Sequence, residues 1–218
     1  MMEAVTRIIG GTAGGRRIGT PPGAGTRPTS DRVREGLYSR LEHLEVVTGA
    51  RVLDLYAGSG ALGLEAASRG AAHVLLVESE RSVARLARDN AAAVGLADRV
   101  LVRAEPVERV LLGGPAGPTG VADAGGAGEP GDAAGASGTA YGLVLLDPPY
   151  DLGEGRLGDV LALLDTHGWL AADALVVVER SARSPEPAWP AGLRLEGERR
   201  YGETKLWFAT VPSPGDVA

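Results

Sequence analysis

The sequence predicts an α/β fold whose mostly parallel sheet ends in an antiparallel pair of strands. Short apolar runs of the kind found in buried parallel strands recur along the chain, and stretches with helical periodicity lie between several of them. These runs cover residues 52–55, 72–78, 100–102, 143–146 and 174–179. The first run leads into a glycine turn and then a helical pattern over 61–67, which is how an open α/β sheet places a ligand at a strand's carboxyl end. The alternation of apolar and polar residues in 193–196 and the pattern of 205–209 predict the two closing antiparallel strands.

Length and composition are those of a globular protein. The 218 residues are 44% hydrophobic and 23% charged, and no apolar run reaches the ~18–20 residues that a membrane span needs. We therefore expect a cytoplasmic protein with no membrane partner. The absence of cysteine excludes disulfides, thiolate metal sites and a cysteine nucleophile. The three histidines are isolated, so no metal site is predicted.

The pattern divides the chain into three parts. Residues 1–45 form an amino-terminal extension with a β-hairpin and a helix, residues 46–211 form the main domain, and residues 212–218 form a flexible tail. Residues 113–140 consist largely of Gly, Ala, Pro, Ser and Thr, which cannot bury enough apolar surface to offset the entropy of ordering. We expect a disordered loop there, across which the sheet still closes.

Positive charge is concentrated at the amino-terminal end, although the formal net charge is −6. Between residues 5 and 40 there are seven arginines and only two acidic residues, so this segment alone carries +5. Lys205 is the only lysine in the chain. Arginine forms bidentate contacts with phosphate oxygens and stacks on bases, so the extension is a candidate surface for nucleic acid.

The extension is predicted to contain a short β-ribbon followed by a helix. Residues 7–20 read as two strands around a glycine-rich bend, which is either a nucleic-acid probe or an ordinary solvated hairpin. Thr29 or Ser30 can begin the helix, whose apolar stripe is Val33, Leu37, Leu41 and Leu44. We interpret Arg32 and Arg34 as lying off this stripe. The candidate RNA-binding residues are Arg7, Arg16, Arg17, Arg27, Thr29, Arg32 and Arg34.

The glycine turn follows an aspartate, which decides between two kinds of ligand. Gly58, Gly60 and Gly63 have the spacing of a dinucleotide fingerprint, but Asp54 would repel a pyrophosphate. A carboxylate there suits a ligand with a cation and hydroxyls. The D-x-x-x-G-x-G pattern resembles motif I of the Rossmann-like S-adenosylmethionine (SAM) methyltransferases. The candidate cofactor-binding residues in this stretch are Asp54, Tyr56, Ala57, Gly58, Ser59 and Gly60.

The ends of the next two strands supply further candidates for the cofactor site. Glu78 ends the second run, where such folds bind ribose hydroxyls, although it could also be a surface acid at a helix start. Ser79 joins it in the site and can cap a helix that Gly95 terminates. After the third run, Ala104 and Glu105 occupy the place expected for the adenine.

A second motif follows the run 143–146 and reads Asp147-Pro148-Pro149-Tyr150. Two prolines fix φ and remove two backbone donors, which alone would indicate only a rigid strand exit. With the acid before them and the aromatic after them, the motif resembles [DNS]-P-P-[YFW] of enzymes that methylate amino groups on planar substrates. These four residues are the candidate catalytic residues.

With these motifs in place, the chain resembles the bacterial 16S ribosomal RNA (guanine-N2)-methyltransferases of the RsmD type. The matching stretches are 7–11, 27–35, 54–63, 147–150 and 200–204. The resemblance implies a class I SAM-dependent methyltransferase fold with a seven-stranded sheet and SAM as the cofactor. It also implies a guanine of 16S ribosomal RNA in an assembling 30S particle as the acceptor, and we expect a monomer. The low-complexity segment 113–140 departs from the family.

The motifs also suggest a mechanism. The Asp147 carboxylate and the Pro148 carbonyl would accept the two hydrogens of the guanine amino group, and Tyr150 would stack on a base that has left its helix. The alternatives are an adenine-N6 methyltransferase of DNA or RNA, and a non-catalytic SAM-binding assembly factor. Glutamine methylation uses a similar motif that begins with Asn, and Asp147 argues against it.

Overall fold

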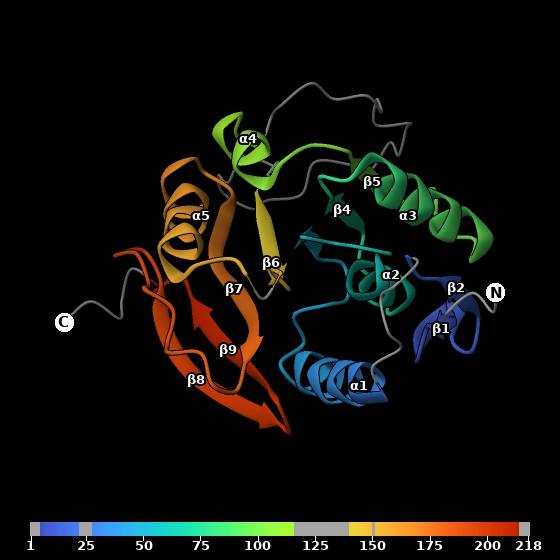
Figure 1. Ribbon diagram of the computed structural model, residues 1–218, viewed down its shortest axis with the longest axis horizontal. Coiled ribbons are helices and arrows are strands. Elements are labelled where there is room, and N and C mark those ends of the chain that lie inside the picture. Colours follow the sequence, from blue (N-terminus) through green and yellow to red (C-terminus); the bar gives the residue numbers. More distant parts are fainter. Residues whose placement is uncertain (1–4, 22–27, 116–139, 150, 214–218) are drawn as a thin grey trace, which may run out of the picture.

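The computed structural model describes residues 5–21, 28–115, 140–149 and 151–213. Its main sheet has seven strands in the order β5-β4-β3-β6-β7-β9-β8, the first five parallel and the last two antiparallel to their neighbours (Figure 1). The predicted fold class is therefore confirmed. Among the described residues, no helix combines the length and the apolar character that crossing a membrane requires.

The elements follow one another along the chain as the apolar runs indicated. The small amino-terminal sheet consists of β1 (Val5–Arg7) and β2 (Arg17–Gly19), joined through the 3-10 turn η1 (Gly11–Ala13). The strands of the main sheet are β3 (Arg51–Leu55), β4 (His73–Val77), β5 (Val100–Arg103), β6 (Tyr141–Leu146), β7 (Leu170–Ser181), β8 (Arg194–Tyr201) and β9 (Thr204–Thr210). The helices are α1 (Pro28–His43), α2 (Ala61–Ser68), α3 (Arg81–Ala93), α4 (Val107–Leu112) and α5 (Glu154–Thr166).

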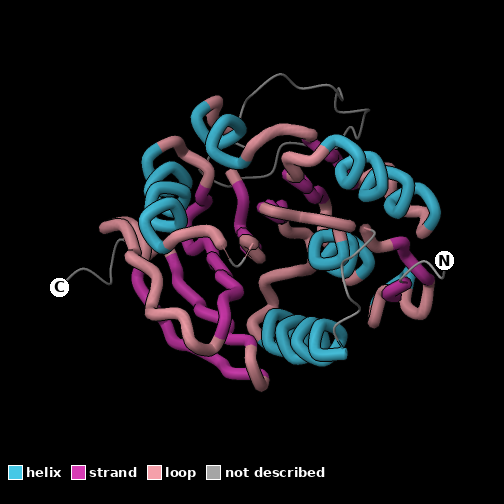
Figure 2. Tube along the Cα trace, in the orientation of Figure 1, coloured by secondary structure: helices cyan, strands magenta, loops and turns pink. Residues whose placement is uncertain are grey.

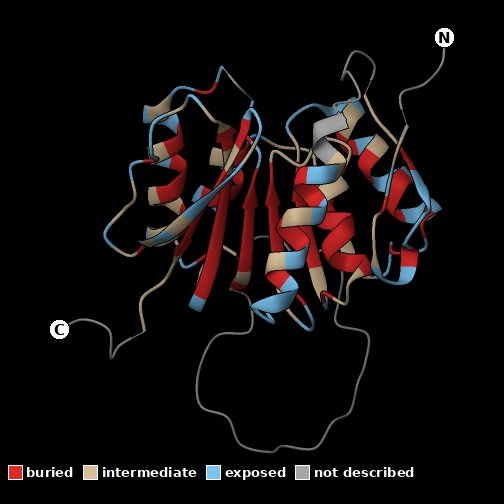
Figure 3. Ribbon diagram, turned by 90° about the horizontal axis from the view of Figure 1, so that it is seen from below, coloured by how far each residue is buried: buried red, intermediate tan, exposed pale blue. Residues whose placement is uncertain are grey.

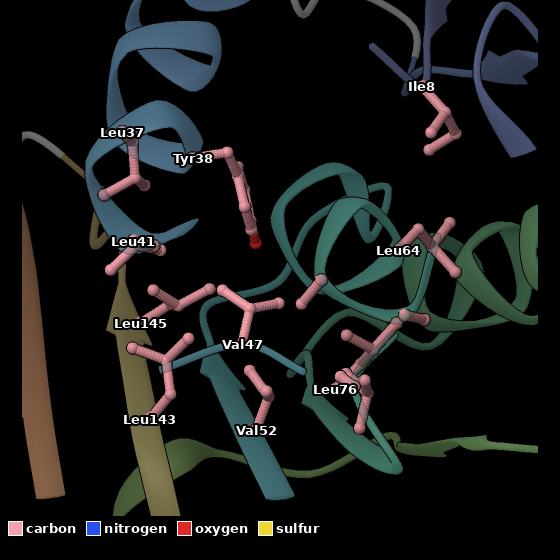
Figure 4. Close-up of a cluster of buried hydrophobic side chains, with 14 of the residues drawn as sticks. Ile8, Leu37, Tyr38, Leu41, Val47, Val52, Leu64, Leu76, Leu143 and Leu145 are labelled. Carbon is pink, nitrogen blue, oxygen red and sulfur yellow. The ribbon is translucent and has the colours of Figure 1, made fainter. Parts of the chain in front are cut away.

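Helices cover both faces of the sheet, which explains why the central strands are continuously apolar (Figures 2 and 3). Successive strand residues point to opposite faces, so Val52 belongs to the cluster under α1, α2 and α3 while Leu53 belongs to the cluster under α4 and α5. Figure 4 shows the first cluster, where α1 lies over Val52 and two residues of β6. In the same cluster, the buried Tyr38 hydroxyl donates a hydrogen bond of 2.6 Å to the Leu62 carbonyl.

Two predictions of local structure in the helices were wrong, and one helix was missed. The cap of α3 is Glu80, whose carboxylate accepts from the Ser82 amide at 3.2 Å, and not Ser79. Leu44 is 42% exposed because α1 ends at His43, and Tyr38 fills the core in its place. Helix α4 was not predicted, because its six residues are too short to show a helical period. Most of the predicted loop 113–140 lies outside the described residues, and β6 nevertheless pairs with β3 across it.

The amino-terminal ribbon is attached to α2 by a buried carboxylate. Glu65, which is fully buried, accepts from the Ile9 amide at 2.7 Å and from the Gly10 amide at 2.8 Å. Its third partner is Arg69, whose Nε lies 2.7 Å from the carboxylate. Ile8 and Ile18 of the ribbon join the main core. The ribbon therefore shares one folding unit with the sheet, and Glu65 fixes its position.

Replacing Glu65 with Gln should destabilise the protein. An amide presents one acceptor oxygen and one donor group to these donors, so at least one buried donor loses its partner, at a cost of roughly 1–3 kcal/mol. Urea unfolding followed by circular dichroism measures this. The matched control is Glu42→Gln, since Glu42 also pairs with Arg69, at 2.7 Å, but is about half exposed, at 51%. That change should cost less than about 1 kcal/mol. Equal costs for the two variants would contradict the anchoring role.

Candidate functional site

The two sequence motifs meet at one edge of the sheet. β3 and β6 are parallel neighbours with Leu55 in register with Leu146, so the residues that follow both strands lie side by side. β4 and β5 continue the same edge on the other side of β3, which brings Glu78 and Ala104 to it as well. A carboxyl edge of parallel strands is where open α/β sheets bind ligands. The fold thus brings together residues that are about ninety positions apart in the chain.

Asp54 has a buried carboxylate, and one of its two oxygens has no hydrogen-bond partner among the described residues. The residue is 1% exposed, and its Oδ2 accepts from the Gly63 amide at 2.8 Å. Its Oδ1 is buried and has no hydrogen-bond partner among the described residues. Burial is the main cause that raises the pKa of Asp54 to about 7; the hydrogen bond from the Gly63 amide opposes the shift, and the charges of Asp147 and Glu78 contribute to it. Such a carboxyl is set up to accept a hydrogen bond from, or to pair with, a positively charged ligand group.

The turn after β3 contains three residues with left-handed backbone conformation, two of which are glycines. Tyr56, Gly58 and Gly60 all have positive φ, at 63°, 56° and 82°. Positive φ is strained for tyrosine, and strain of this kind concentrates at functional sites. At Gly63 a Cβ would lie 2.3 Å from Leu76 Cδ2, so only glycine lets α2 approach β4 this closely. This third glycine serves helix–sheet packing and the hydrogen bond to Asp54.

Glu78 supports the same turn from the neighbouring strand. Its Oε2 accepts from the Gly58 amide at 3.0 Å and its Oε1 accepts from the Glu80 amide at 2.8 Å. The carboxylate is therefore a structural clamp on the glycine turn, and it is only half-buried. Ser79 is exposed beside it. The predicted role of these two residues in binding the cofactor stays a prediction.

The residues predicted near the adenine are less open to a ligand than the sequence suggested. Glu105 accepts from Arg103 Nη2 at 2.8 Å and lies 3.5 Å from Arg109 Nε. Its carboxylate is thus already paired with two cations. Ala104 is half-buried and packs against the first core cluster.

Asn90 links two parts of the candidate site, a role that sequence reasoning missed. It is 4% exposed on α3 and its Nδ2 donates to the Ser59 carbonyl in the glycine turn, at 2.9 Å. The same amide group makes two bonds of 2.9 Å with the main chain of Gly19 in β2. It therefore connects the amino-terminal ribbon to the glycine turn. The sequence contained a signal for this role, because Asn90 is a polar residue on the apolar stripe of its helix, and a buried polar side chain needs hydrogen-bond partners.

The arginines of the extension fall into three groups. Arg7, Arg17 and Arg32 are exposed. Arg16 is exposed too, but its Nη1 donates to the Val94 carbonyl at 2.8 Å and so holds the ribbon against the end of α3. Arg34 is 4% exposed and donates to Asp31 at 2.6 Å and to Thr6 at 3.1 Å.

The interpretation of Arg34 as lying off the buried stripe was therefore wrong. Its guanidinium faces the core side of α1 and joins that helix to β1. Three of the proposed site residues cannot be placed in this way: Arg27 and Tyr150 lie outside the described residues, and so does the side chain of Thr29.

The second motif is held in place from β7. Asp147 and Pro149 are exposed and Pro148 is buried between them. The Leu152 amide donates to the Pro149 carbonyl at 2.9 Å, which closes a turn directly after the motif. Arg180 of β7, 5% exposed, donates to the Leu152 carbonyl at 2.9 Å and to Glu154 at 2.6 Å. This buried guanidinium, which the sequence reasoning also missed, anchors the turn to the sheet.

Comparisons with known proteins agree on one family. The family model described as Conserved hypothetical protein 95 matches residues 6–114 and 127–210. A ribosomal RNA small subunit methyltransferase D of Escherichia coli (strain K12) is 34% identical over 197 residues, covering 90% of this chain and 85% of the relative. YlbH of Bacillus subtilis (strain 168) is 30% identical over 198 residues, covering 91% and 95%. The structure of yhhF from Escherichia coli aligns with a TM-score of 0.75 and 31% identity, covering 96% of this chain and 99% of the other.

Replacing Asp54 with Asn should stabilise the ligand-free protein at neutral pH. The folded-state pKa of about 7 lies above the ordinary value of 3.8, so the folded protein binds this proton more tightly than the unfolded chain does. The resulting stability is complete below about pH 4 and is lost as the pH rises through about 7. The free energy of unfolding of the wild type should fall relative to that of the variant, on the order of 4 kcal/mol across this range.

Denaturant unfolding of both proteins between pH 4 and pH 8 measures this difference. Asp159→Asn, at an exposed position on α5, is the control and should follow the wild type throughout. If the curves of the wild type and the Asp54 variant ran parallel across the range, the buried carboxyl would not have the raised pKa.

Proposed function

Because this chain belongs to the RsmD-type family of bacterial ribosomal RNA small subunit methyltransferases, we propose that it methylates the N2 amino group of guanine 966 in 16S ribosomal RNA. The coarser activity, SAM-dependent methylation of ribosomal RNA, comes with the family. The guanine and its amino group are our proposal. So is the substrate form, a small subunit that is still assembling, and so is a monomeric enzyme.

The observation that carries the proposal is the pairing of β3 with β6. Leu55 and Leu146 are in register, so the turn that follows Asp54 and the motif that begins at Asp147 lie next to each other. The charge of Asp147 contributes to the raised pKa of Asp54, which also indicates that the two carboxylates are close. A site for a methyl donor and a site for an amino acceptor must adjoin in this way, because most of the rate gain comes from positioning the two reactants.

The residues at the edge fit SAM. The unpartnered Oδ1 of Asp54 is an acceptor without a protein donor, in an edge that contains three carboxylates, and this suits a cofactor with an ammonium group and ribose hydroxyls. We infer that the cofactor is held by Asp54, Tyr56, Ala57, Gly58, Ser59, Gly60, Glu78, Ser79, Ala104 and Glu105. When bound, SAM supplies a methyl group on a positively charged sulfur.

On the acceptor side, Asp147 and Pro148 have complementary tasks. A guanine amino group is a poor nucleophile because its lone pair is delocalised into the ring. The exposed Asp147 carboxylate and the Pro148 carbonyl would each accept one amino hydrogen, which favours tetrahedral nitrogen and directs its lone pair. Tyr150 would stack on the base, worth on the order of 1–3 kcal/mol, and the base must leave its helix to reach this place. Arg180 keeps the turn after the motif fixed for this purpose.

The amino-terminal extension would hold the RNA. Arg7, Arg17 and Arg32 are exposed and available for phosphate, and we propose the same role for Arg27 and Thr29. Arg16 would add to this surface while it holds the ribbon on α3. Arg34 is buried, so we assign it a supporting role through Asp31 and Thr6. The contact of Asn90 with both Gly19 and Ser59 would keep the RNA-contacting ribbon at a fixed distance from the cofactor turn.

Replacing Asp147 with Ala should abolish methyl transfer and leave SAM binding largely intact. Removing one preorganised group of this kind typically lowers kcat by about 10²–10³. The assay is transfer of radiolabelled methyl groups to small subunits from cells that lack the protein, followed by digestion of the RNA and identification of the methylated base. Asp159→Ala is the control, because Asp159 is an exposed acid on α5.

Near-normal turnover by the Asp147 variant would refute the acceptor role. A wild-type product with N6-methyladenine in place of N2-methylguanine would replace guanine by adenine as the substrate base. No labelled base at all would leave a non-catalytic binding protein.

A further inference from the structure

One of the matching stretches, residues 200–204, takes no part in the cofactor or acceptor sites proposed above. It joins β8 to β9 and contains the two-residue turn Gly202-Glu203. We call residues 199–205 the hairpin tip. Contacts with the rest of the protein hold the tip in place. Thr204 is 7% exposed, and the Ala182 amide donates to the Glu203 carbonyl at 2.8 Å, which extends the pairing beyond β7.

The hairpin tip stands on the same edge of the sheet as Asp147. In register, Leu146 pairs with Val178 of β7, and Ser181 of β7 pairs with Thr204 of β9. The tip therefore reaches three residues beyond the end of β6, or about 10 Å at ~3.3 Å per strand residue. β7 lies between the tip and the acceptor motif, and the five parallel strands are all on one side of the tip.

Helix α1 fixes the other face of the tip. A Cβ on Gly36 would lie 2.6 Å from Cε1 of the Tyr201 ring and 2.7 Å from its hydroxyl oxygen, so the ring lies directly against the helix backbone. Only glycine at this helical position permits such an approach. Tyr201 also packs against the first core cluster. The tip is thus joined to the helix that carries the exposed Arg32, one of the proposed RNA contacts.

Three cations form a row across the sheet at the tip. Arg180 pairs in register with Lys205, and Lys205 pairs with Arg200. Like charges placed opposite one another on neighbouring strands destabilise a sheet unless something neutralises them. Arg180 has Glu154 at 2.6 Å and Lys205 has Glu198 at 3.1 Å. Within the part of the chain that the structure describes, Arg200 has only the Gly202 carbonyl, at 3.0 Å.

Arg199, on the opposite face of the strand, is likewise bonded to a main-chain carbonyl and not to a carboxylate of the described residues. It is exposed and its Nη1 donates to the Glu198 carbonyl at 2.8 Å. Among the described residues, no carboxylate forms an ion pair with Arg199 or with Arg200. Both guanidinium groups are therefore held near the backbone while most of their donors face solvent, at the same end of the sheet as the acceptor motif.

We propose that the hairpin tip is a second RNA-binding element, in which Arg199 and Arg200 bind backbone phosphates of the RNA that presents the target base. This inference rests on the proposed function, since it requires an RNA substrate at the carboxyl edge. The arginine fork suits phosphate oxygens, and an added anion would neutralise Arg200, the member of the row that has no carboxylate partner among the described residues. Figure 1 shows the β1–β2 ribbon and the β8–β9 hairpin on opposite sides of the molecule. RNA bound by both would be gripped on two sides of the acceptor motif.

The test compares three single substitutions on one strand: Arg199→Gln, Arg200→Gln and the control Arg194→Gln. Arg194 lies six residues before Arg200, about 20 Å away at the far edge of the sheet, and is paired with Glu196 at 3.0 Å. The dissociation constant for naked small-subunit ribosomal RNA is measured between 50 and 200 mM salt. Each tip variant should lower the slope of log affinity against log salt by about 0.7–0.9, and the control should leave it unchanged.

Kinetics separate binding from chemistry. The tip variants should raise KM for RNA and leave kcat, the SAM dissociation constant and the unfolding midpoint at wild-type values. Wild-type salt slopes for both variants, with an active wild type, would overturn the tip's role and leave the proposed function standing. A wild type that transfers no methyl group to ribosomal RNA would instead refute the proposed function. Weaker binding to assembled particles only, with naked RNA unaffected, would mean that the tip meets a ribosomal protein, which overturns the RNA contact.

Discussion

The parallel pairing of β3 with β6 determines where the two sequence motifs lie relative to each other. It joins two segments about ninety residues apart and places the ends of both strands at one edge, so Asp54 and Asp147 become neighbours. Both strands are buried on both faces, and the apolar clusters on the two faces supply the driving force. The cost of closing a loop rises only slowly with its length, so the low-complexity segment between β5 and β6 leaves this pairing intact.

Around this pairing, polar side chains that bond to main-chain groups join the remaining parts to the site. Glu65 holds the bend of the ribbon on α2, Asn90 joins the ribbon to the glycine turn, and Glu78 clamps the same turn from β4. Arg180 does the equivalent for the turn after the second motif. Each of these groups would be costly to bury without partners, and with them it permits one arrangement of the backbone. The ribbon and the glycine turn are thus parts of one rigid assembly.

The sequence predicted the sheet well because a strand that is buried on both faces must be apolar throughout. Short continuous apolar runs such as 143–146 are typical of such strands. It also placed the two motifs, because each follows such a run directly. It failed for single polar side chains, whose partners are distant in the chain. Arg34 and Arg32 are chemically identical, yet only Arg34 has the i, i+3, i+4 and i+7 relation to Leu37, Tyr38 and Leu41 that turns it inward. Sequence reasoning could have found Arg34 by this spacing, but nothing local identifies Arg180 as the anchor of residues 152–154.

The arrangement of charge explains how a chain of net charge −6 can act on a polyanion. Charges interact effectively only within about 8–10 Å at physiological salt, so local groups decide what binds. The carboxyl edge concentrates Asp54, Glu78 and Asp147; the charges of the other two help to raise the pKa of Asp54, and together the three carboxylates favour a cationic ligand. The ribbon and the hairpin that carry the exposed arginines lie on opposite sides of the molecule. In our proposal the acidic centre binds the methyl donor and the basic flanks bind phosphate, and the attachment of the ribbon to α2 and of the tip to α1 fixes where these flanks lie. The net charge of the whole chain is therefore a poor guide to its ligand, and the position of each charge relative to the edge is a good one.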